Sequence, residues 1–340
     1  MWGQTIGTDD YPVFNDGSNT VYATTGCATY NNDGIEGERE HNLVDGKCTA
    51  CGTYVISTAE QLFSFAEDVR LKNTEIDAVL ANDITVNESV FDENGELKES
   101  LTEWTPIGRS SSAYSGTFDG AGHTVSGLYF NKSTTQNIGL FGCVGKNGVV
   151  RNVGVVDSYF SGSTYVGGVC AYNEGTIANC YSIATVGGGN YIGGICGYNL
   201  GIVVNCYSIA KVSGVNVNIG GICGYMLKGA IINCYYDKNE YTGEAVSWTA
   251  HDATLTNVNG ITPARFESGM AAYMLSQGCK IGSVTYDGSI WGQEIGKDKS
   301  PVLGGKKVYV TTGCVSYNND GNEGEKAHNF ENGICIDCGS

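Results

Sequence analysis

The sequence predicts an all-β protein whose central part is a right-handed parallel β-helix, a solenoid with coils of about 26 residues. Three observations support this prediction. A GG-x-C-x-Y motif recurs at nearly constant spacing, short β-branched runs between Gly and Asn fill each repeat, and no repeat has room for a helix. Stacked coils, each with three strands, would bury a common apolar face. The right hand follows from the general preference of parallel crossovers.

Composition supports a folded chain and excludes several partners. Fifty Gly against four Pro indicate frequent turns, and 41% hydrophobic residues argue against disorder. Acidic residues (36) outnumber basic ones (19), so the net charge of -17 argues against nucleic-acid binding and is explained most simply by solubility. No run of about 18 apolar residues occurs, so we expect no membrane insertion. The N-terminal segment is polar and does not resemble a signal peptide.

Both ends carry the same module. Residues 2–14 read WGQTIGTDDYPVF and residues 291–303 read WGQEIGKDKSPVL. Repetition over this distance indicates tandem units, so the chain would hold the end of one unit and the whole of the next. We expect residues 1–52 to be the tail module of a preceding unit, residues 53–246 a capped β-helix, residues 247–290 a C-terminal cap with a helix near 263–276, and residues 291–340 a second tail module. Neighbouring tandem units would be partners.

Columns of Cys and Asn mark equivalent positions in successive coils. The Cys columns are Cys170, Cys196 and Cys223, and Cys180, Cys206 and Cys234. The Asn column is Asn152, Asn179, Asn205 and Asn233. Stacked amides can hydrogen-bond along such a ladder at a turn. Three thiols in a column cannot all pair with one another, so we interpret these Cys as small buried apolar residues, although neighbouring coils lie within disulfide reach.

Helices should cover both ends of the solenoid, because bare sheet edges aggregate. Residues 57–60, Ser-Thr-Ala-Glu, form a capping box. The apolar stripe that follows consists of Ala59, Leu62, Phe63, Ala66 and Val69. Thr262 and Pro263 start a second helix. Its stripe consists of Phe266, Met270, Tyr273 and Met274. Both stripes are expected to pack onto a terminal coil.

The central repeats resemble the GLUG-motif repeats. The likeness is carried by IGLFG at residues 138–142, by its variants VGGVCAY and IGGICGY, and by WTPIG at 104–108 and YSGTFDG at 114–120. It covers roughly residues 53–236. The resemblance implies a solenoid from a large surface protein of Gram-positive or gut bacteria, such as an adhesin or the non-catalytic part of an immunoglobulin A peptidase. It implies no ligand site. Cys170, Cys196 and Cys223 stand where the motif usually has small residues.

A Cys/His set recurs in the two terminal modules with spacings of 14, 7 and 3 residues. The first set is Cys27, His41, Cys48 and Cys51, and the second is Cys314, His328, Cys335 and Cys338. Three thiolates and one imidazole suit tetrahedral zinc, and the CxxC turn brings two sulfurs to one ion. We therefore expect a structural zinc ion in each module. Disulfides, which are normal in exported proteins, and free thiols are the alternatives.

Two columns of Tyr are the candidate ligand-binding residues. Tyr172, Tyr198 and Tyr225 form one, and Tyr181, Tyr207 and Tyr235 form the other. A column that faces solvent would offer a flat stripe on which sugar rings could pack, with hydroxyls for polar contacts. The partner would then be a host or dietary glycan or glycoprotein. The alternative for either column is a structural ladder at a corner of the coil.

No catalytic motif is present, since HExxH and GxSxG are both missing. His123 and His251 are the only His outside the Cys/His sets. Acids that do not recur at equivalent coil positions are Asp119, Asp157, Glu174 and Asp237. We therefore expect a non-catalytic adhesin or display module, secreted and held at the cell surface. A carbohydrate-active β-helix enzyme and a structural spacer are the alternatives.

Overall fold

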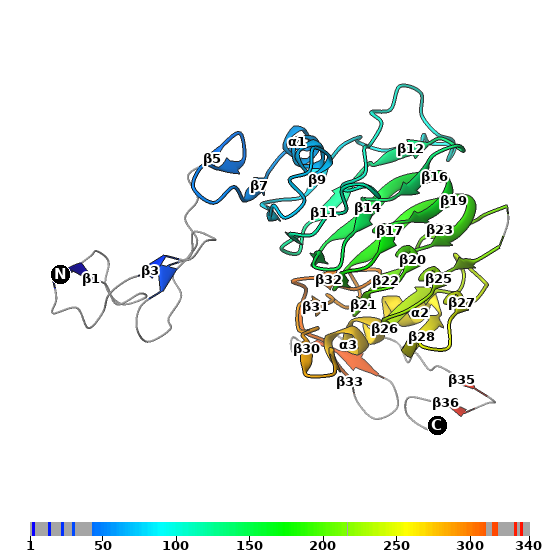
Figure 1. Cartoon of the computed structure of the whole chain (residues 1–340). Coiled ribbons are helices and arrows are strands. Elements are labelled where there is room, and N and C mark those ends of the chain that lie inside the picture. The colour runs from blue at the N-terminus through cyan, green and yellow to red at the C-terminus, as the bar shows by residue number, and fades with distance from the viewer. Residues whose placement is uncertain are drawn as a thin grey trace.

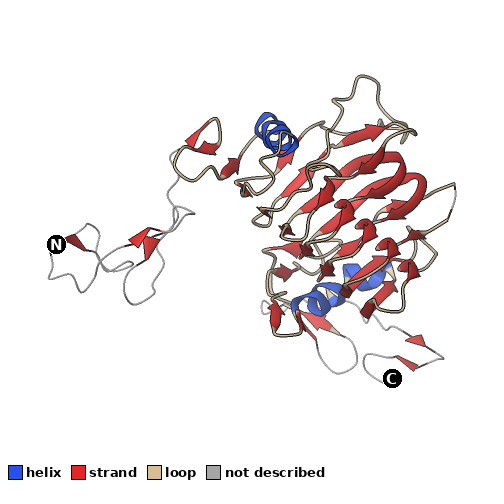
Figure 2. Ribbon diagram, in the orientation of Figure 1, coloured by secondary structure: helices blue, strands red, loops and turns tan. Residues whose placement is uncertain are grey.

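The computed structural model describes residues 43–215, 217–310 and 315–318, and outside these ranges only the backbone of six two-residue strands. It is a parallel β-solenoid of about 8 turns with 9% helix. Figure 1 shows the coils stacked from α1 (Ala59–Arg70) toward β28 (Thr254–Ile261). The helices α2 (Pro263–Glu267) and α3 (Met270–Ser276) lie outside the stack, beside its last coils (Figure 2). The predicted all-β solenoid is confirmed. In the part of the chain that is described, no helix is long and apolar enough to cross a membrane.

Each well-formed coil contains three parallel strands. One coil comprises β14 (Phe141–Val144), β15 (Val149–Arg151) and β16 (Gly154–Gly167), and the next comprises β17 (Cys170–Asn173), β18 (Thr176–Ala178) and β19 (Tyr181–Gly193). The third strand is long because it bends around corners without losing its parallel partner. A bulge lies in the first bend, where Asp157 has a positive φ of 42°.

The other strands complete the stack and its flanks. Preceding coils contain β7 (Tyr54–Ile56), β8 (Ala78–Leu80), β9 (Ile84–Thr85), β10 (Thr117–Asp119), β11 (Thr124–Ser126), β12 (Tyr129–Asn131) and β13 (Gln136–Ile138). Later coils contain β20 (Cys196–Asn199), β21 (Ile202–Val204), β22 (Tyr207–Ser208), β23 (Lys211–Val212), β24 (Ile219–Gly220), β25 (Cys223–Met226), β26 (Ala230–Asp237), β27 (Val246–Thr249) and β28. Antiparallel pairs are β1 (Trp2–Gly3) with β2 (Val13–Phe14), β3 (Tyr22–Ala23) with β4 (Thr29–Tyr30), β5 (Leu43–Val44) with β6 (Lys47–Cys48), β29 (Cys279–Ile281) with β30 (Val284–Tyr286), β31 (Trp291–Gly292) with β32 (Val302–Leu303), β33 (Tyr309–Val310) with β34 (Ser316–Tyr317), and β35 (Phe330–Glu331) with β36 (Ile334–Cys335).

Both Cys columns line the interior. Cys170 pairs in register with Cys196, which pairs with Cys223. All six Cys of the two columns are fully buried thiols within the main apolar core. They pack as small apolar side chains. The Gly pairs that precede them in the sequence are also required by close packing between coils. A Cβ on Gly194 would lie 2.1 Å from the hydroxyl of Ser208, so only Gly fits where the chain of one coil passes under the next.

The Asn column forms the corners of the coils. Asn152, Asn179, Asn205 and Asn233 all have a left-handed backbone, with φ between 52° and 55°, a conformation that Asn tolerates better than most residues. Their amides form the predicted ladder only in part. Asn179 Nδ2 donates to Asn152 Oδ1 (3.1 Å), and Asn233 Nδ2 donates to Asn205 Oδ1 (2.9 Å). Between these pairs the ladder is interrupted, because Asn205 Nδ2 donates to the carbonyl of Tyr286 instead (3.3 Å).

The parallel pairing continues past the boundary predicted at residue 246. Strand β27 pairs with β25, and β28 pairs with β26, so a further coil extends to Ile261. The sequence signal fades here because Val246 and Trp248 occupy the positions that Cys223 and Tyr225 hold one coil earlier.

The first helix begins one residue later than the predicted capping box. Thr58 is the N-cap, and its hydroxyl accepts a hydrogen bond from the backbone N–H of Gln61 (3.3 Å). The Gln61 side chain accepts in turn from the N–H of Ser57 (2.7 Å). The helix face also differs from the predicted stripe. Phe65 is fully buried against Tyr114, whereas Ala59 and Phe63 are only half-buried.

The C-terminal cap departs further from its prediction. Gly269, with a φ of 84°, interrupts the expected helix and separates α2 from α3. The two helices pack against the side of the stack rather than onto a terminal coil. Their buried residues Phe266 and Leu275 contact the cluster formed by the second Tyr column and Trp291. The hairpin β29–β30 covers the adjacent face, where Ile281 packs with the side chains of β18, β21 and β26.

Candidate functional site

The Tyr181 column is buried and offers no surface to a ligand. Tyr207 is 0% exposed, and its hydroxyl donates to the carbonyl of Pro301 (2.7 Å). Tyr181 and Tyr235 are also buried, and Trp291 packs edge-on to Tyr181, with ring centroids 6.0 Å apart. Of the two alternatives, a solvent-facing stripe for sugar binding and a structural ladder, this column is therefore the structural ladder. The sequence repeat could not reveal it, because the covering segment lies about a hundred residues away in the chain.

The Tyr172 column lies on another face and is half-exposed. Tyr172, Tyr198 and Tyr225 pair in register on β17, β20 and β25. Their ring centroids are 5.2 and 5.1 Å apart, with interplanar angles of 3° and 9°. Trp248 extends the stack by one ring, 4.2 Å from Tyr225, and is 42% exposed. This stack of four rings is called the aromatic ladder below.

A second, shorter column flanks the aromatic ladder. Tyr165 and Tyr191 stack at 5.2 Å and meet the ladder edge-on, as in the contact of Tyr165 with Tyr172 at 5.8 Å and 80°. Both have a left-handed backbone, with φ of 55° and 57°. Such a conformation costs a bulky residue about 1–2 kcal/mol. Strain of this kind tends to be retained at functional sites.

The sequence held a signal for this second column. The register aligns Tyr165 with Asn137 and Tyr191 with Asn218, and these two Asn also have positive φ values of 63° and 64°. The same corner thus reads Asn, Tyr, Tyr, Asn in four successive coils. The replacement of Asn, which suits this backbone, by Tyr in the two middle coils marks the position as unusual.

The geometry corrects the expectation of a flat stripe. Because the rings are stacked along the solenoid axis, Tyr198 and Tyr225 have both faces covered by neighbouring rings. They present edges and hydroxyls to solvent. Burial, followed by the neighbouring Tyr172 ring, raises the pKa of Tyr198 to about 12, so this hydroxyl remains a hydrogen-bond donor at neutral pH. Only the end rings, Tyr172 and Trp248, have an outer face that no ladder ring covers.

A cavity of about 340 Å³ adjoins the Tyr172 end of the aromatic ladder. Its lining comprises Ser110, Ala113, Gln136, Asn137, Cys143, Val144, Tyr165, Tyr172 and Glu174. It combines two aromatic rings with amide, hydroxyl and carboxylate groups, the mixture typical of sites for small polar ligands. We call this cavity the ladder-end cavity.

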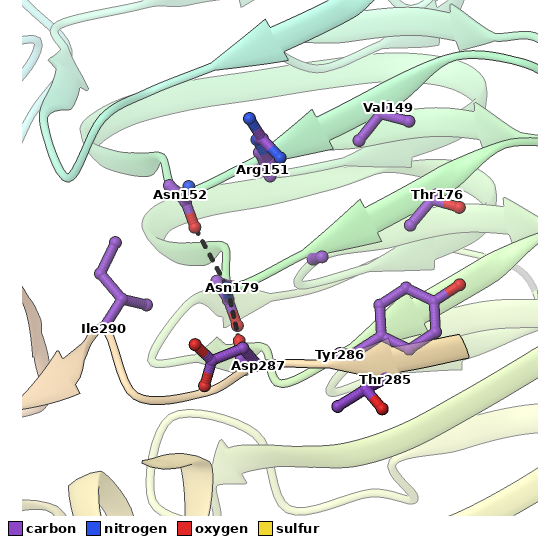
Figure 3. Close-up of a pocket in the computed structure, with 10 residues that line it drawn as sticks. Val149, Arg151, Asn152, Thr176, Asn179, Thr285, Tyr286, Asp287 and Ile290 are labelled. Atoms are coloured by element: carbon purple, nitrogen blue, oxygen red, sulfur yellow. Dashed lines mark hydrogen bonds between the residues drawn. The ribbon is translucent and has the colours of Figure 1, made fainter. Parts of the chain in front are cut away.

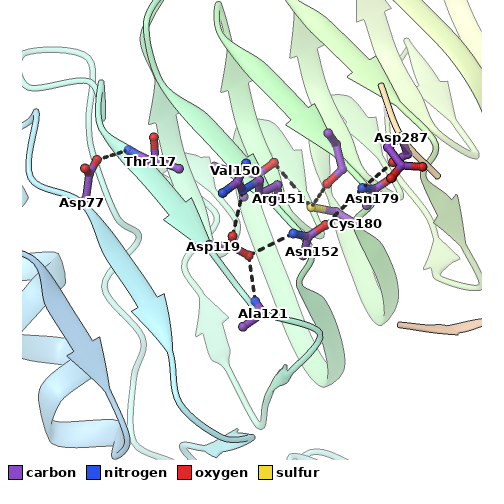
Figure 4. A network of polar contacts seen from close by, with 11 residues as sticks. Asp77, Thr117, Asp119, Ala121, Val150, Arg151, Asn152, Asn179, Cys180 and Asp287 are labelled. Atoms are coloured by element: carbon purple, nitrogen blue, oxygen red, sulfur yellow. Dashed lines mark hydrogen bonds and ion pairs between the residues drawn. The ribbon is translucent and has the colours of Figure 1, made fainter. Parts of the chain in front are cut away.

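A larger cavity of about 580 Å³ lies between the solenoid and the segment that follows β30 (Figure 3). Its polar groups largely bond one another. Arg151 Nε donates to Asp119 Oδ2 (2.8 Å), while Asp119 Oδ1 accepts from Asn152 (3.0 Å), as Figure 4 shows. Asn179 Nδ2 donates to the carbonyl of Asp287 (3.1 Å). The bond from Asn179 fastens the C-terminal segment to the solenoid. The bonds from Arg151 and Asn152 lie within the solenoid and leave Asp119 satisfied by structural partners.

A third cavity brings two acids together. Asp157, on the bulge of β16, and the exposed Glu240 both line a space of about 660 Å³, together with Lys211. Burial raises the pKa of Asp157. Glu174 belongs to the ladder-end cavity instead, and Asp237 is occupied by the N–H of Asn239 (2.8 Å).

Of the eight predicted zinc ligands, only Cys48 and Cys51 lie within the described residues. Cys48 is buried at the end of β6, and the turn to β7 is closed by the N–H of Gly52 donating to the Cys48 carbonyl (2.9 Å). The CxxC segment therefore lies in a tight turn. Cys27, His41, Cys314, His328, Cys335 and Cys338 lie outside the residues whose side chains are described. Among the described side chains, no group of three His, Cys, Asp or Glu forms a metal site.

Comparison with known proteins finds two relatives that are much longer than this chain. No protein-family model matches it. A Gly-rich membrane protein of Evansella cellulosilytica is 34% identical over 79 residues, which are 22% of this chain and 9% of that protein. Halomucin of Haloquadratum walsbyi is 28% identical over 187 residues, which are 52% of this chain and 2% of halomucin. The chain thus spans less than a tenth of either relative.

Among solved structures, one similar chain is a Bacteroides ovatus protein described as a candidate immunoglobulin A1 protease. The likeness covers 65% of this chain and 70% of that one, with 19% identity and a TM-score of 0.46. The chain is a repeat-type β-solenoid with relatives among large surface proteins.

Proposed function

We propose that this chain is a non-catalytic display module of a large, secreted cell-surface protein, and that its aromatic ladder binds glycans. The membrane-protein and halomucin relatives support a surface location. The short share of those relatives that it spans supports a module repeated within a longer chain. The strongly acidic composition supports a soluble, extended rod that does not adhere to nucleic acid.

The single observation that carries glycan binding is the half-exposed aromatic ladder. Ordinary surfaces rarely expose four stacked rings, and exposed aromatic clusters usually mark interaction sites. The ladder edge offers the hydroxyl of Tyr198 and its neighbours as polar contacts, beside apolar ring edges. The strain at Tyr165 and Tyr191 adds support, because a purely structural corner could use Asn, as the flanking coils do.

The test is retention on immobilised mucin and plant glycans, measured together with released reducing ends. We expect retention without release. A variant that lacks all four ladder rings, with Ala at positions 172, 198, 225 and 248, should abolish retention while keeping the circular dichroism spectrum of a folded solenoid. Tyr129→Ala, at a half-exposed Tyr stacked on Tyr159 on a different face, is the matched control and should leave it unchanged. A wild-type chain that no glycan retains would refute glycan binding and favour the structural spacer.

A carbohydrate-active enzyme is the second candidate function, and the cavity shared by Asp157 and Glu240 favours it. A half-buried acid with a raised pKa can donate a proton while an exposed carboxylate assists, as glycosidases require. If this cavity were catalytic, the chain would release reducing ends, and Asp157→Asn would stop the release without affecting retention by the ladder. Absence of release from all glycans would exclude this function for them.

We also propose that the Cys/His sets bind zinc as structural links between tandem units. The tight turn between Cys48 and Gly52 supports this proposal. Metal analysis of the purified chain should give two zinc ions, and His41→Ala with His328→Ala should remove both. Metal-free protein with disulfide-linked Cys48 or Cys51 would establish the alternative.

A further inference from the structure

The aromatic ladder ends abruptly at one coil. In register with Tyr172, the preceding coil carries Cys143. In register with Tyr165, it carries Asn137. Two aromatic columns therefore stop at the same level, and each is continued by a much smaller side chain. The ladder-end cavity lies at this level, because it is lined by Tyr172 and Tyr165 together with Cys143 and Asn137 of the preceding coil.

The cavity stands where one more ring of the ladder would lie. Neighbouring strands are about 4.8 Å apart, and the ladder rings repeat at 5.2 and 5.1 Å. A missing ring therefore leaves a gap of roughly two strand spacings along the axis. The turn that contains Ser110 and Ala113 also lines the cavity. The space is thus suited to a single flat ring with an apolar face, stacked on Tyr172.

Polar groups surround this ring-shaped space. Asn137 Nδ2 donates to Ser110 Oγ (3.1 Å), which fixes the amide and leaves its oxygen as an acceptor. Gln136 adds a second amide, and Glu174 adds a carboxylate. Amide and carboxylate groups around an aromatic face can bond the equatorial hydroxyls of a sugar, while the ring face covers its C–H groups.

Charge restricts the ligand further. Among the described residues, no Lys, Arg or His lines the cavity, and Glu174 places a negative charge in it. Anionic ligands such as phosphates, uronic acids and sialic acids are therefore disfavoured. The thiol of Cys143 contributes no reactive anion, because burial raises its pKa to about 11.

We propose that the ladder-end cavity is a subsite for one neutral pyranose ring, stacked on the outer face of Tyr172. This proposal rests on the proposed glycan binding and narrows it to a ligand class and a place. The ladder edge would contact the rest of the glycan, and the cavity would receive a terminal or branching sugar. Cys143 is then a specificity-determining residue, because its small size keeps the space open.

The decisive variant is Cys143→Phe, which continues the aromatic ladder by one ring and fills the cavity. Binding of methyl β-galactoside, methyl β-glucoside, methyl α-mannoside and N-acetylglucosamine is measured by saturation-transfer NMR and calorimetry. Wild type should bind at least one of them, and Cys143→Phe should weaken that binding at least tenfold. The thermal unfolding midpoint shows whether the variant is folded. Tyr172→Leu, which removes the ring face without filling the space, should weaken binding similarly.

Several results would overturn the proposal. Glucuronate or sialic acid binding as tightly as the neutral sugars would contradict the charge argument. Free adenine binding more tightly than every sugar would assign the space to an aromatic ligand. Equal sugar binding by folded Cys143→Phe and wild type would place the sugar elsewhere, with glycan retention by the ladder left standing. If wild type retains glycans on the column yet binds none of the four sugars, the subsite fails alone. Loss of retention as well would reject the proposed function itself.

Discussion

Trp291 packs against Tyr207 on the side of the solenoid, with ring centroids 5.4 Å apart and planes inclined at 59°. Trp291 is almost fully buried, and its Nε1 donates to the carbonyl of Asn205 (3.0 Å). In the other direction, the hydroxyl of Tyr207 donates a hydrogen bond to the carbonyl of Pro301 in the C-terminal segment. Trp291 therefore joins the C-terminal segment to the middle coil that contains Asn205 and Tyr207, while α3 is joined to a later coil through Asn233.

Replacing Trp291 should destabilise the chain severely. Trp291→Ala leaves a large cavity over the Tyr181 column and an unpaired Asn205 carbonyl, so we expect a loss of about 3–5 kcal/mol in the free energy of unfolding. Denaturant titration followed by circular dichroism measures it. Trp248→Ala, at a half-exposed Trp, is the control and should cost clearly less. Equal losses for the two variants would mean that the C-terminal segment does not stabilise the solenoid.

Substitutions at the corner residue Asn205 separate the stability that its left-handed backbone contributes from the stability that its side-chain amide contributes. Asn205 is fully buried, has a φ of 52°, and bonds both Asn233 and the Tyr286 carbonyl. We expect Asn205→Ala to cost about 2–4 kcal/mol, from backbone strain and unsatisfied partners. Asn257→Ala removes an exposed Asn with the same φ of 52° and should cost only the backbone part. If both variants lose the same stability, the Asn amides do not contribute.

Much of the fold is predictable from the sequence, because a repeat of nearly constant length indicates stacked, equivalent coils. The recurrence of Cys170 and Tyr172 at a nearly constant interval identifies a solenoid, since side chains in one column meet identical environments. The segments outside the repeat are not predictable in the same way. Residues 247–303 keep only the corner Asn of the coil pattern, since Asn257 lies in register with Asn233. This single residue does not reveal the extra coil through β28, and nothing in the repeat reveals the attachment of Trp291 to Tyr207.

The candidate site was predictable only as a list of Tyr. Both columns recur with the same period, and periodicity alone does not tell which column another segment covers. Ring orientation also depends on side-chain torsions that spacing does not reveal, so the spacing predicts a flat stripe where the structure has stacked rings. The ladder-end cavity exists because Cys143 stands at the position where later coils have Tyr. Only the strand register of the structure shows that these positions are equivalent.

The buried Cys columns should be unreactive thiols in the folded chain. Cys196 and Cys223 are 0% exposed, and burial raises the pKa of both, which suppresses the reactive thiolate. In Ellman titration at pH 8, the six column thiols should react only after denaturation. The control is Cys279, which is only partly buried and should react in the folded chain. Cys48 and Cys143 are buried as well, so the column thiols are identified by alkylation in denaturant and mass spectrometry of their peptides. A column Cys that is not alkylated without reductant would indicate a disulfide in the columns.

The free energy of unfolding should decrease at alkaline pH, because burial also raises the pKa of the Cys143 thiol. The folded pKa of Cys143 is about 11, above the ordinary thiol value, so the unfolded chain releases its proton first as pH rises. The stabilisation is fully present below about pH 8.5 and is lost between there and pH 11, at up to about 1.4 kcal/mol per pH unit for each such group. Cys143→Ala should show a shallower decline over pH 9–11 than wild type. Identical slopes would mean that this thiol does not titrate with unfolding.

Removing an inner ring should create a second ring-shaped space. Tyr198→Ala uncovers one face each of Tyr172 and Tyr225, which now sandwich Tyr198 at 5.2 and 5.1 Å. If sugars bind by stacking on a free ring face, calorimetry should give two sites per chain instead of one. Loss of the two ring contacts should cost about 1–3 kcal/mol of stability. One site with unchanged affinity would show that a free ring face is not sufficient for binding.

The attachment of the C-terminal segment to a middle coil also determines how the rod would carry tension. In a chain of tandem units, a pull on the residues after 303 is transmitted through Trp291 to the wall at Asn205. The load therefore enters the solenoid from the side, and the last strand, β28, is not peeled away first. We expect single-molecule pulling to show one early, small extension as this clamp releases, followed by coil-by-coil unravelling at a separate force. Trp291→Ala should remove the early event.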